Sequence, residues 1–206
     1  MKLRKTIIST LFTALPLALM FTGGKAQVEM DSAKQAEMMA LFQQLNTPGE
    51  EHKRLESLVG AWDIEVITWH QPGAEPLVFK GKGTSKMILG GRFLETRSTS
   101  GEGEMATEAL TILGYDKRQK KYTSVGYDTW GTYYVMAAGE YDDKTKSIVM
   151  HGEDYDPMMK FTQKWDFVLK FIDKDKYVWE VVFTDEWHTQ GKGPFKMVEI
   201  TSTRAK

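Results

Sequence analysis

The pattern of hydrophobic positions changes its period at about Ala61. Before this residue, apolar side chains recur three and four residues apart, which places them on one face of a helix. The residues with this spacing are Met38, Leu41, Phe42 and Leu45. Asp31 or Ser32 can cap this helix at its start, and Asn46 and Pro48 predict its end.

A second, shorter helix is predicted directly afterwards. The sequence Thr47-Pro48-Gly49-Glu50 has the spacing of a capping box with proline at the first helical position. Gly60 predicts the end of this helix, in a left-handed conformation. Its apolar face consists of Leu55, Leu58 and Val59. We therefore expect residues 27–47 to form an N-terminal helical arm and residues 48–206 to form the folded domain.

From Ala61 onward, hydrophobic and polar residues alternate, as in strands with one buried face. The clearest run covers residues 161–171, and turn sequences such as Gly90-Gly91 and Asp173-Lys174-Asp175 separate the runs. The predicted strands cover residues 61–69, 77–89, 92–100, 105–114, 121–130, 132–141, 146–153, 160–172, 176–185 and 194–204.

The order of these elements predicts an all-β fold. No helix is expected between strands, so parallel crossovers are disfavoured, and the short turns favour an antiparallel up-and-down order. Ten twisted strands in an open sheet would leave two long edges, and closure into a barrel removes them. We therefore expect an antiparallel, closed or nearly closed barrel of about ten strands, preceded by two helices. A sandwich of two sheets is the alternative.

Residues 1–26 have the composition of a secretory signal peptide. A basic start precedes an apolar stretch over residues 7–21, and Gly24 and Ala26 are small residues at the −3 and −1 positions of a cleavage site. The apolar stretch is shorter than the roughly 20 residues of a membrane-spanning helix, which disfavours an anchor. The sequence thus predicts a secreted or periplasmic protein, cleaved near Ala26, with no membrane span after processing.

Charge and cysteine content exclude several classes of partner and site. Residues 1–26 carry four of the 27 basic residues and none of the 28 acidic ones, so the remaining 180 residues have 23 basic and 28 acidic side chains and a formal charge of −5. This acidic balance argues against nucleic acid as a partner. The chain contains no cysteine, which excludes disulfides, zinc–thiolate sites and thiol catalysis.

A series of short motifs follows the chain in a characteristic order. They are His52 before Leu58-Val59-Gly60-Ala61-Trp62, then Gly90-Gly91-Arg92-Phe93-Leu94, Leu113-Gly114-Tyr115-Asp116 with Tyr122 and Asp128 after it, and Gly139-Glu140-Tyr141-Asp142. Over residues 48–204 the chain resembles the bacterial family catalogued as domain of unknown function 1579. The resemblance implies a calycin-like barrel in a secreted protein, without an established activity or catalytic residues. The Gly-x-Trp element is also similar to that of lipocalins, fatty-acid-binding proteins and nitrobindins.

Polar and aromatic residues within the strands are candidates for a ligand site in the barrel lumen, because small-ligand sites place a few polar groups among apolar ones. The candidates are Trp62, Arg97, Glu108, Asp128, Tyr134, His151, Gln163, Trp165 and Glu199. They can instead face solvent or form a closed internal network, since a shift of one residue in register turns every side chain to the other face. Trp62 is expected mainly to seal the barrel floor.

Two clusters contain residues that can bind a metal ion or haem. His151 and Glu153, together with Asp154 or Asp156, offer ligands for a divalent ion, but their spacing fits no known loop and favours a solvated turn. His188 is similar in position to the haem ligand of nitrobindins, but it is expected in a loop and not in a strand. The sequence therefore predicts no metal, cofactor or catalytic site.

Three functions remain open at this point. The one we favour is a periplasmic barrel that binds a small lipophilic molecule in its lumen. The first alternative is an enzyme that uses His151 and Glu153 as acid–base groups. The second is an envelope interaction protein with a filled barrel, in which residues 29–46 dock onto a partner. The sequence leaves the oligomeric state open.

Overall fold

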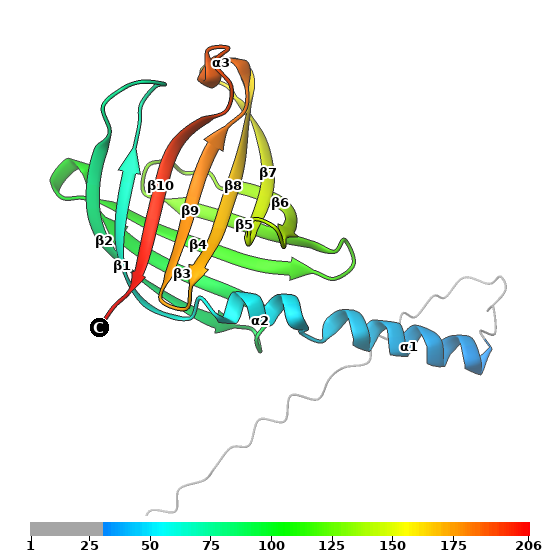
Figure 1. The fold of residues 1–206 in the computed structure, drawn as a ribbon. Coiled ribbons are helices and arrows are strands. Elements are labelled where there is room, and N and C mark those ends of the chain that lie inside the picture. Colours follow the sequence, from blue (N-terminus) through cyan, green and yellow to red (C-terminus); the bar gives the residue numbers. More distant parts are fainter. Residues whose placement is uncertain (1–30) are drawn as a thin grey trace, which may run out of the picture. The chain divides into compact units, whose positions relative to one another are not determined.

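The computed structural model describes residues 31–206, so the predicted signal peptide and its cleavage site near Ala26 lie outside the described residues. The chain divides into two compact units, of which the second, Met39–Lys206, contains the sheet (Figure 1). Within the described residues, no helix has the length and apolar character needed to cross a membrane.

Two consecutive helices precede the sheet, as predicted: α1 (Ser32–Asn46) and α2 (Glu50–Glu56). The predicted cap of the second helix is wrong. Gly49 is the N-cap of α2, and its backbone N–H donates to Nδ1 of His52 at 3.1 Å. Thr47 instead closes the end of α1, where its hydroxyl donates to the Gln43 carbonyl at 2.8 Å. An imidazole thus takes the place of the carboxylate or amide that a capping box uses.

Ten antiparallel strands close into a barrel in the order β1-β10-β9-β8-β7-β6-β5-β4-β3-β2, which confirms the predicted fold class. The first and last strands pair directly, for example at Ile64 and Ser202, so no sheet edge is left open and the two-sheet alternative is wrong. The strands are β1 (Gly60–Thr68), β2 (Leu77–Ile88), β3 (Phe93–Ser100), β4 (Thr107–Asp116), β5 (Lys121–Asp128), β6 (Val135–Asp142), β7 (Ser147–Asp156), β8 (Phe161–Asp173), β9 (Lys176–Phe183) and β10 (Phe195–Arg204). A 3₁₀ turn (Gly103–Met105) and α3 (Glu186–Thr189) lie in two of the loops.

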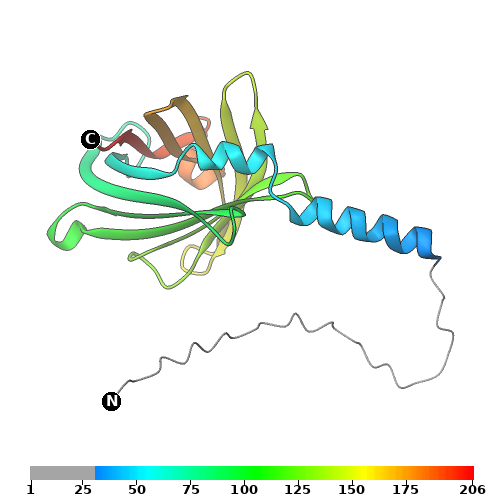
Figure 2. The same cartoon turned by 90° about the horizontal axis from the view of Figure 1, so that it is seen from below.

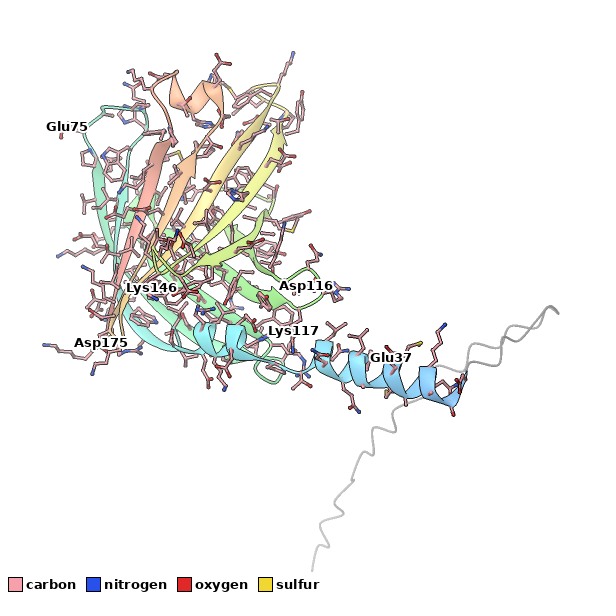
Figure 3. The ribbon with its side chains drawn as sticks, turned by 45° about the vertical axis from the view of Figure 1, so that its right-hand side comes forward. Glu37, Glu75, Asp116, Lys117, Lys146 and Asp175 are labelled. Atoms are coloured by element: carbon pink, nitrogen blue, oxygen red, sulfur yellow. The ribbon has the colours of Figure 1, made fainter. Side chains whose placement is uncertain are left out.

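The up-and-down order divides the connections between two ends of the barrel. One end, which we call the closed end, carries α2 and the tight turns, and it includes Asp175 in the β8–β9 turn (Figures 1 and 3). The other, which we call the open end, carries the longer loops, and it includes Glu75 (Figure 3). The loops of the open end are residues 69–76, 101–106, 129–134, 157–160 and 184–194.

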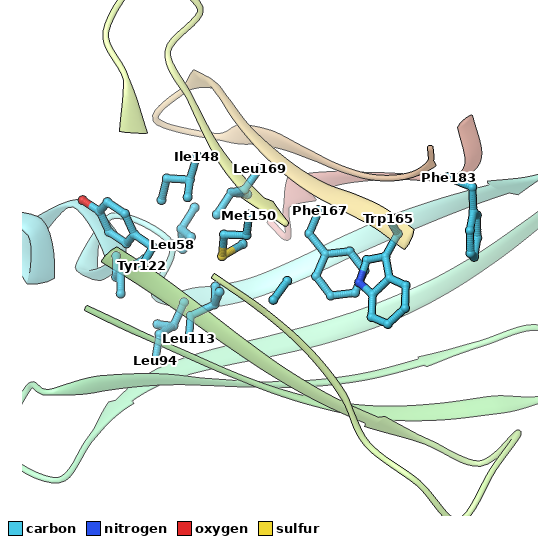
Figure 4. Packing of buried hydrophobic residues seen from close by; sticks show 12 residues of the cluster. Leu58, Leu94, Leu113, Tyr122, Ile148, Met150, Trp165, Phe167, Leu169 and Phe183 are labelled. Atoms are coloured by element: carbon cyan, nitrogen blue, oxygen red, sulfur yellow. The ribbon is translucent and has the colours of Figure 1, made fainter. Parts of the chain in front are cut away.

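The closed end is filled by side chains. Leu55 and Leu58, at the end of and just after α2, are 0% and 4% exposed and join the central hydrophobic cluster. Figure 4 shows Leu58 close to Ile148 and Leu169, and Figure 2 shows α2 beside the strands. Full burial of each such leucine stabilises the fold by about 1.5–3 kcal/mol. The short helix therefore serves as the floor of the barrel.

Trp62 seals this floor, as the sequence predicted. Its side chain is buried, and its indole N–H donates to the Leu58 carbonyl at 3.0 Å. The predicted role of Gly60 is wrong, because it begins β1 and does not end α2. Glycine is favoured there because φ is 142°, a backbone conformation that other residues rarely adopt.

Candidate functional site

A cavity of about 620 Å³ occupies the barrel interior toward the open end; we call it the lumen cavity. Most of its wall comes from every second residue of the strands, because successive side chains of a strand face opposite sides of the sheet. Its lining residues are Ile64, Val66, Thr68, Leu77, Phe79, Ser98, Ser100, Met105, Thr107, Ala109, Thr111, Ser124, Gly126, Tyr127, Asp128, Trp130, Val135, Phe167, Trp179, Val181, Met197, Val198 and Ile200.

The deeper part of the lumen cavity is apolar. Phe167 and Trp179 form an aromatic pair with ring centroids 5.4 Å apart, and both line the cavity. Ile64 and Ile200, from the two strands that close the barrel, lie on its wall as well. A smaller cavity of about 80 Å³ continues from these residues toward Leu58. The inner wall thus offers a ligand mainly van der Waals contact and removal from water.

Hydroxyl groups interrupt this wall at several positions, among them Ser98, Thr111 and Ser124, and Ser124 differs from the others in being buried without a partner among the described residues. Its side chain is 1% exposed, and its hydroxyl has no hydrogen-bond partner in the part of the chain that the structure describes. A buried hydroxyl without a partner costs about 1–3 kcal/mol, so such groups are rare in native proteins. Because Ser124 lines the lumen cavity, a polar atom of a ligand there is able to supply the missing bond.

A carboxylate and an indole mark the rim of the lumen cavity where β5 ends. Oδ1 of Asp128 accepts a hydrogen bond from the backbone N–H of Trp130 at 2.8 Å. The aspartate side chain thereby stabilises the turn that follows it. The Trp130 indole N–H donates to Oγ1 of Thr107 at 2.7 Å, across to β4. These two bonds hold the Trp130 ring at the rim although the residue is 62% exposed.

Of the predicted lumen candidates, Asp128 alone lies on the wall of the lumen cavity. Arg97 and Glu108 do not have the interior orientation expected of them. Their neighbours Ser98 and Ala109 line the lumen cavity, so the pleat of β3 and β4 turns Arg97 and Glu108 outward. There they line a shallow groove on the outer face, and Arg97 pairs with Glu95 at 3.0 Å.

Three further polar candidates also lie away from the lumen cavity. The His151 side chain is 71% exposed, and its Nδ1 lies 2.6 Å from Oδ1 of Asp166. Gln163 donates to Oδ2 of Asp156 at 2.6 Å and ties β7 to β8. Glu199 forms an ion pair with Lys196, which lies three residues earlier on β10. Each of these residues is satisfied by a local partner, so none adds chemistry to the lumen.

The aromatic candidates divide between the core and the surface. Trp62 and Trp165 are buried but belong to the packing around the lumen cavity and not to its lining. The Trp165 ring packs against Phe183, with centroids 6.4 Å apart. Tyr134 is 55% exposed and pairs with Tyr127 at 6.4 Å. Tyr134 precedes β6, which begins later than the predicted strand 132–141.

The two clusters considered for a metal ion or haem have local structural roles. His188 lies in α3, where its Nδ1 is 2.8 Å from Oδ2 of Asp185 and its ring stacks on Phe183 at 3.8 Å. Burial opposes ionisation of Asp185, but hydrogen bonds from the His188 backbone and ring outweigh this effect and lower the pKa of Asp185. No group of three or more potential metal ligands occurs within residues 31–206.

Several residues of the cavity were not predicted. Those with polar side-chain groups include Ser124, Thr107 and Trp130, and also Thr68, Ser98, Ser100, Thr111 and Tyr127. Ser124 follows the buried Tyr122 by two positions on β5, and Asp128 follows Ser124 by four, so all three share the inner face. The even spacing of these residues indicated in the sequence that they share one face. Nothing in the sequence indicated that the 129–134 loop would bring Trp130 to the cavity.

Comparisons with known proteins show the family and the fold. The family model described as "Protein of unknown function (DUF1579)" matches residues 47–204. No curated protein matches the chain in sequence. Two solved structures are similar. Rv2717c from M. tuberculosis has 13% sequence identity and a TM-score of 0.54, and the match covers 78% of this chain and 100% of that chain. The S-type phycobiliprotein lyase CPES from Guillardia theta has 12% sequence identity and a TM-score of 0.51, and the match covers 80% of this chain and 98% of that chain.

At such low identities the two structures establish a shared architecture and nothing about chemistry. The family match covers the floor helix α2, all ten strands and every residue of the lumen cavity. The chain therefore belongs to the DUF1579 family of proteins of unknown function.

Proposed function

We propose that this protein binds a small lipophilic molecule in the lumen of its barrel. The observation that carries the proposal is an apolar cavity of about 620 Å³ inside a closed sheet, with the unpartnered hydroxyl of Ser124 on its wall. Sites for small molecules have volumes of about 300–1,000 Å³ and combine apolar walls with a few polar groups. The cavity volume and its lining fit both criteria.

The lining also bears on the alternative of an acid–base enzyme. Among the residues that line the lumen cavity, Asp128 and Tyr127 are the titratable ones, and no histidine is present. His151, the residue first considered as a base, is exposed and paired with Asp166 outside the cavity. Binding therefore has structural support, and no observation favours catalysis.

A matched pair of substitutions tests the proposal. Ala109 lines the lumen cavity as well as the outer groove, whereas the adjacent Leu110 lines the shallow groove on the outer face and not the lumen cavity. We expect Ala109→Phe to fill part of the cavity and to weaken binding of the neutral fluorophore N-phenyl-1-naphthylamine by about tenfold. Leu110→Phe adds an aromatic ring on the same strand and should leave the affinity within about twofold of wild type.

Native mass spectrometry of gently purified protein is the second measurement. A bound species that is present in wild type and lost in Ala109→Phe supports the proposal. The proposal is overturned if wild type shows only the mass of the free chain and does not bind the fluorophore, or if both variants bind it as wild type does.

Export from the cytoplasm is a separate part of the proposal. It is supported by the basic, apolar and small-residue order of residues 1–26, which lie outside the described residues. Expression in a bacterial host should yield a periplasmic product of 180 residues that begins at Gln27. Recovery of an uncleaved chain from the cytoplasm, identified by intact mass, would contradict it.

A further inference from the structure

The lumen cavity has an uneven distribution of charge. No lysine, arginine or histidine lines it, and Asp128 is its only acidic residue. A carboxylate or phosphate placed in this cavity would lose its hydration and meet no positive partner, which is unfavourable by several kcal/mol for a buried ion. The cavity therefore selects against anionic lipophiles such as free fatty acids.

The rim has the opposite preference. Oδ1 of Asp128 is engaged by the Trp130 backbone N–H, while Oδ2 accepts no hydrogen bond from any described residue. The Trp130 ring is held on the same rim by its bond to Thr107, and both Asp128 and Trp130 line the cavity. A carboxylate next to an exposed indole is a favourable pair for an organic cation, because the carboxylate supplies charge and the ring face supplies a cation–π contact.

The loops around this rim extend the negative charge. The five loops of the open end contain five carboxylates and two lysines, so their net charge is negative; these residues are Glu75, Glu102, Glu104, Asp185 and Glu186 against Lys160 and Lys192. An excess of charge of one sign around the mouth of an apolar cavity raises the local concentration of the oppositely charged ligand. The open end thus attracts cations before they reach Asp128.

We propose that the ligand of the lumen is a lipophilic cation, an amine or quaternary ammonium whose charged group lies between Asp128 and the Trp130 ring and whose apolar body extends to Phe167 and Trp179. This inference rests on the proposed function and specifies its ligand class. Ser124 lies four residues before Asp128 on the inner face of β5, or roughly 13 Å deeper. A hydroxyl or carbonyl at that depth in the ligand satisfies its free hydroxyl.

Ligands that share one alkyl chain and differ in head-group charge test the inference. Decyltrimethylammonium, decanol and decanoate compete with bound N-phenyl-1-naphthylamine, and the displacement gives three affinities for the same protein. For wild type we expect decyltrimethylammonium to bind about tenfold more tightly than decanoate, with a preference that shrinks as the salt concentration rises.

Asp128→Asn removes the charge and keeps the acceptor for the Trp130 N–H. It should weaken binding of decyltrimethylammonium about three- to tenfold and leave decanol unchanged, because Asp128 is an exposed residue and solvent screens part of its charge. Glu108→Gln is the matched control. It changes the net charge equally at the neighbouring strand end. Both residues line the outer groove, but Glu108 does not line the lumen cavity, so all three affinities should stay within about twofold of wild type.

The outcomes separate this inference from the function on which it rests. If decanoate binds as tightly as decyltrimethylammonium, or if Asp128→Asn and Glu108→Gln weaken the cation equally, the lipophilic cation is ruled out while lumen binding stands. If neither the fluorophore nor any decyl compound binds wild type, lumen binding itself is wrong and the inference falls with it.

Discussion

The guanidinium of Arg204 lies over the ring of Trp62, with its central carbon 4.3 Å from the ring centroid. Arg204 is the last residue of β10 and Trp62 is near the start of β1, so this contact stands at the seam where the barrel closes. The same guanidinium donates to the carbonyls of Val59 and Lys174, at 3.0 and 2.9 Å. One side chain therefore joins the floor, the seam and the β8–β9 turn.

Replacement of Arg204 should measure the strength of this seam. Arg204→Met keeps an unbranched apolar stem but removes the charge and the hydrogen bonds. We expect the free energy of unfolding, measured by urea denaturation, to fall by about 2 kcal/mol. Arg97→Ala is the control, because its ion pair with Glu95 lies at a surface where arginine is 64% exposed, and it should cost about 0.5 kcal/mol or less. Equal losses in the two variants would contradict the assigned role of Arg204.

Gly152 provides a second test, in the wall between β7 and β8. A Cβ at this position would lie 2.5 Å from the Trp165 ring and 2.6 Å from the Met136 carbonyl, which belongs to the backbone and cannot turn away. We expect Gly152→Ala to lower the free energy of unfolding by about 1–3 kcal/mol. Gly131→Ala would meet only the exposed ring of Tyr133, which can rotate away, so thermal unfolding of that variant should match wild type.

His52 predicts how stability responds to pH. Burial is the main reason why the pKa of His52 falls below its ordinary value of 6.5, and the neutral ring accepts the Gly49 N–H. The unfolded chain therefore binds a proton more readily than the folded one. The stabilisation from neutral His52 is complete well above pH 6.5 and declines as the pH falls below 6.5 toward the lowered pKa.

The matched variant is His52→Gln, whose side-chain oxygen can accept the same bond without titrating. Between pH 7.5 and pH 5.5, wild type should lose more of its unfolding free energy than His52→Gln does, because only the imidazole takes up a proton on unfolding in this range. Urea denaturation at the two pH values provides the comparison. Parallel losses in both proteins would show that other groups control this pH range.

The sequence predicted which residues form strands. It predicted which face of a strand lies inside the barrel only where the two faces differ strongly in hydrophobicity. In β8, the large residues Trp165, Phe167 and Leu169 alternate with Asp166, Val168 and Lys170, and all three are buried as expected. In β4 the pattern misleads, because Leu110 faces the outer groove while Thr111 lines the lumen cavity. Polar residues on the cavity wall and apolar residues on the outer face reverse the usual rule that the inner face of a strand is apolar and the outer face polar.

The same reversal explains the errors at the candidate site. Arg97 is flanked by Thr96 and Ser98, so neither face of β3 is marked as interior by its composition. Asp128 was identified because it is a polar residue within a predicted strand, but its partner Trp130 depends on the path of a loop. Loop paths follow from tertiary contacts such as the bond between Trp130 and Thr107, which the local sequence does not encode.

Ser124 connects the stability of the free protein to its function. Its hydroxyl is buried against the lumen cavity without a partner, so Ser124→Ala removes an unsatisfied group and should raise the free energy of unfolding of ligand-free protein by about 1 kcal/mol. If that hydroxyl exists to meet a polar atom of the ligand, the same variant should bind its natural ligand, recovered by extraction from wild type, about fivefold more weakly. Binding of a hydrocarbon fluorophore such as anthracene, which has no hydrogen-bonding group, should not change. A variant that is both less stable and equally able to bind the extracted ligand would show that Ser124 is part of the packing and not of the site.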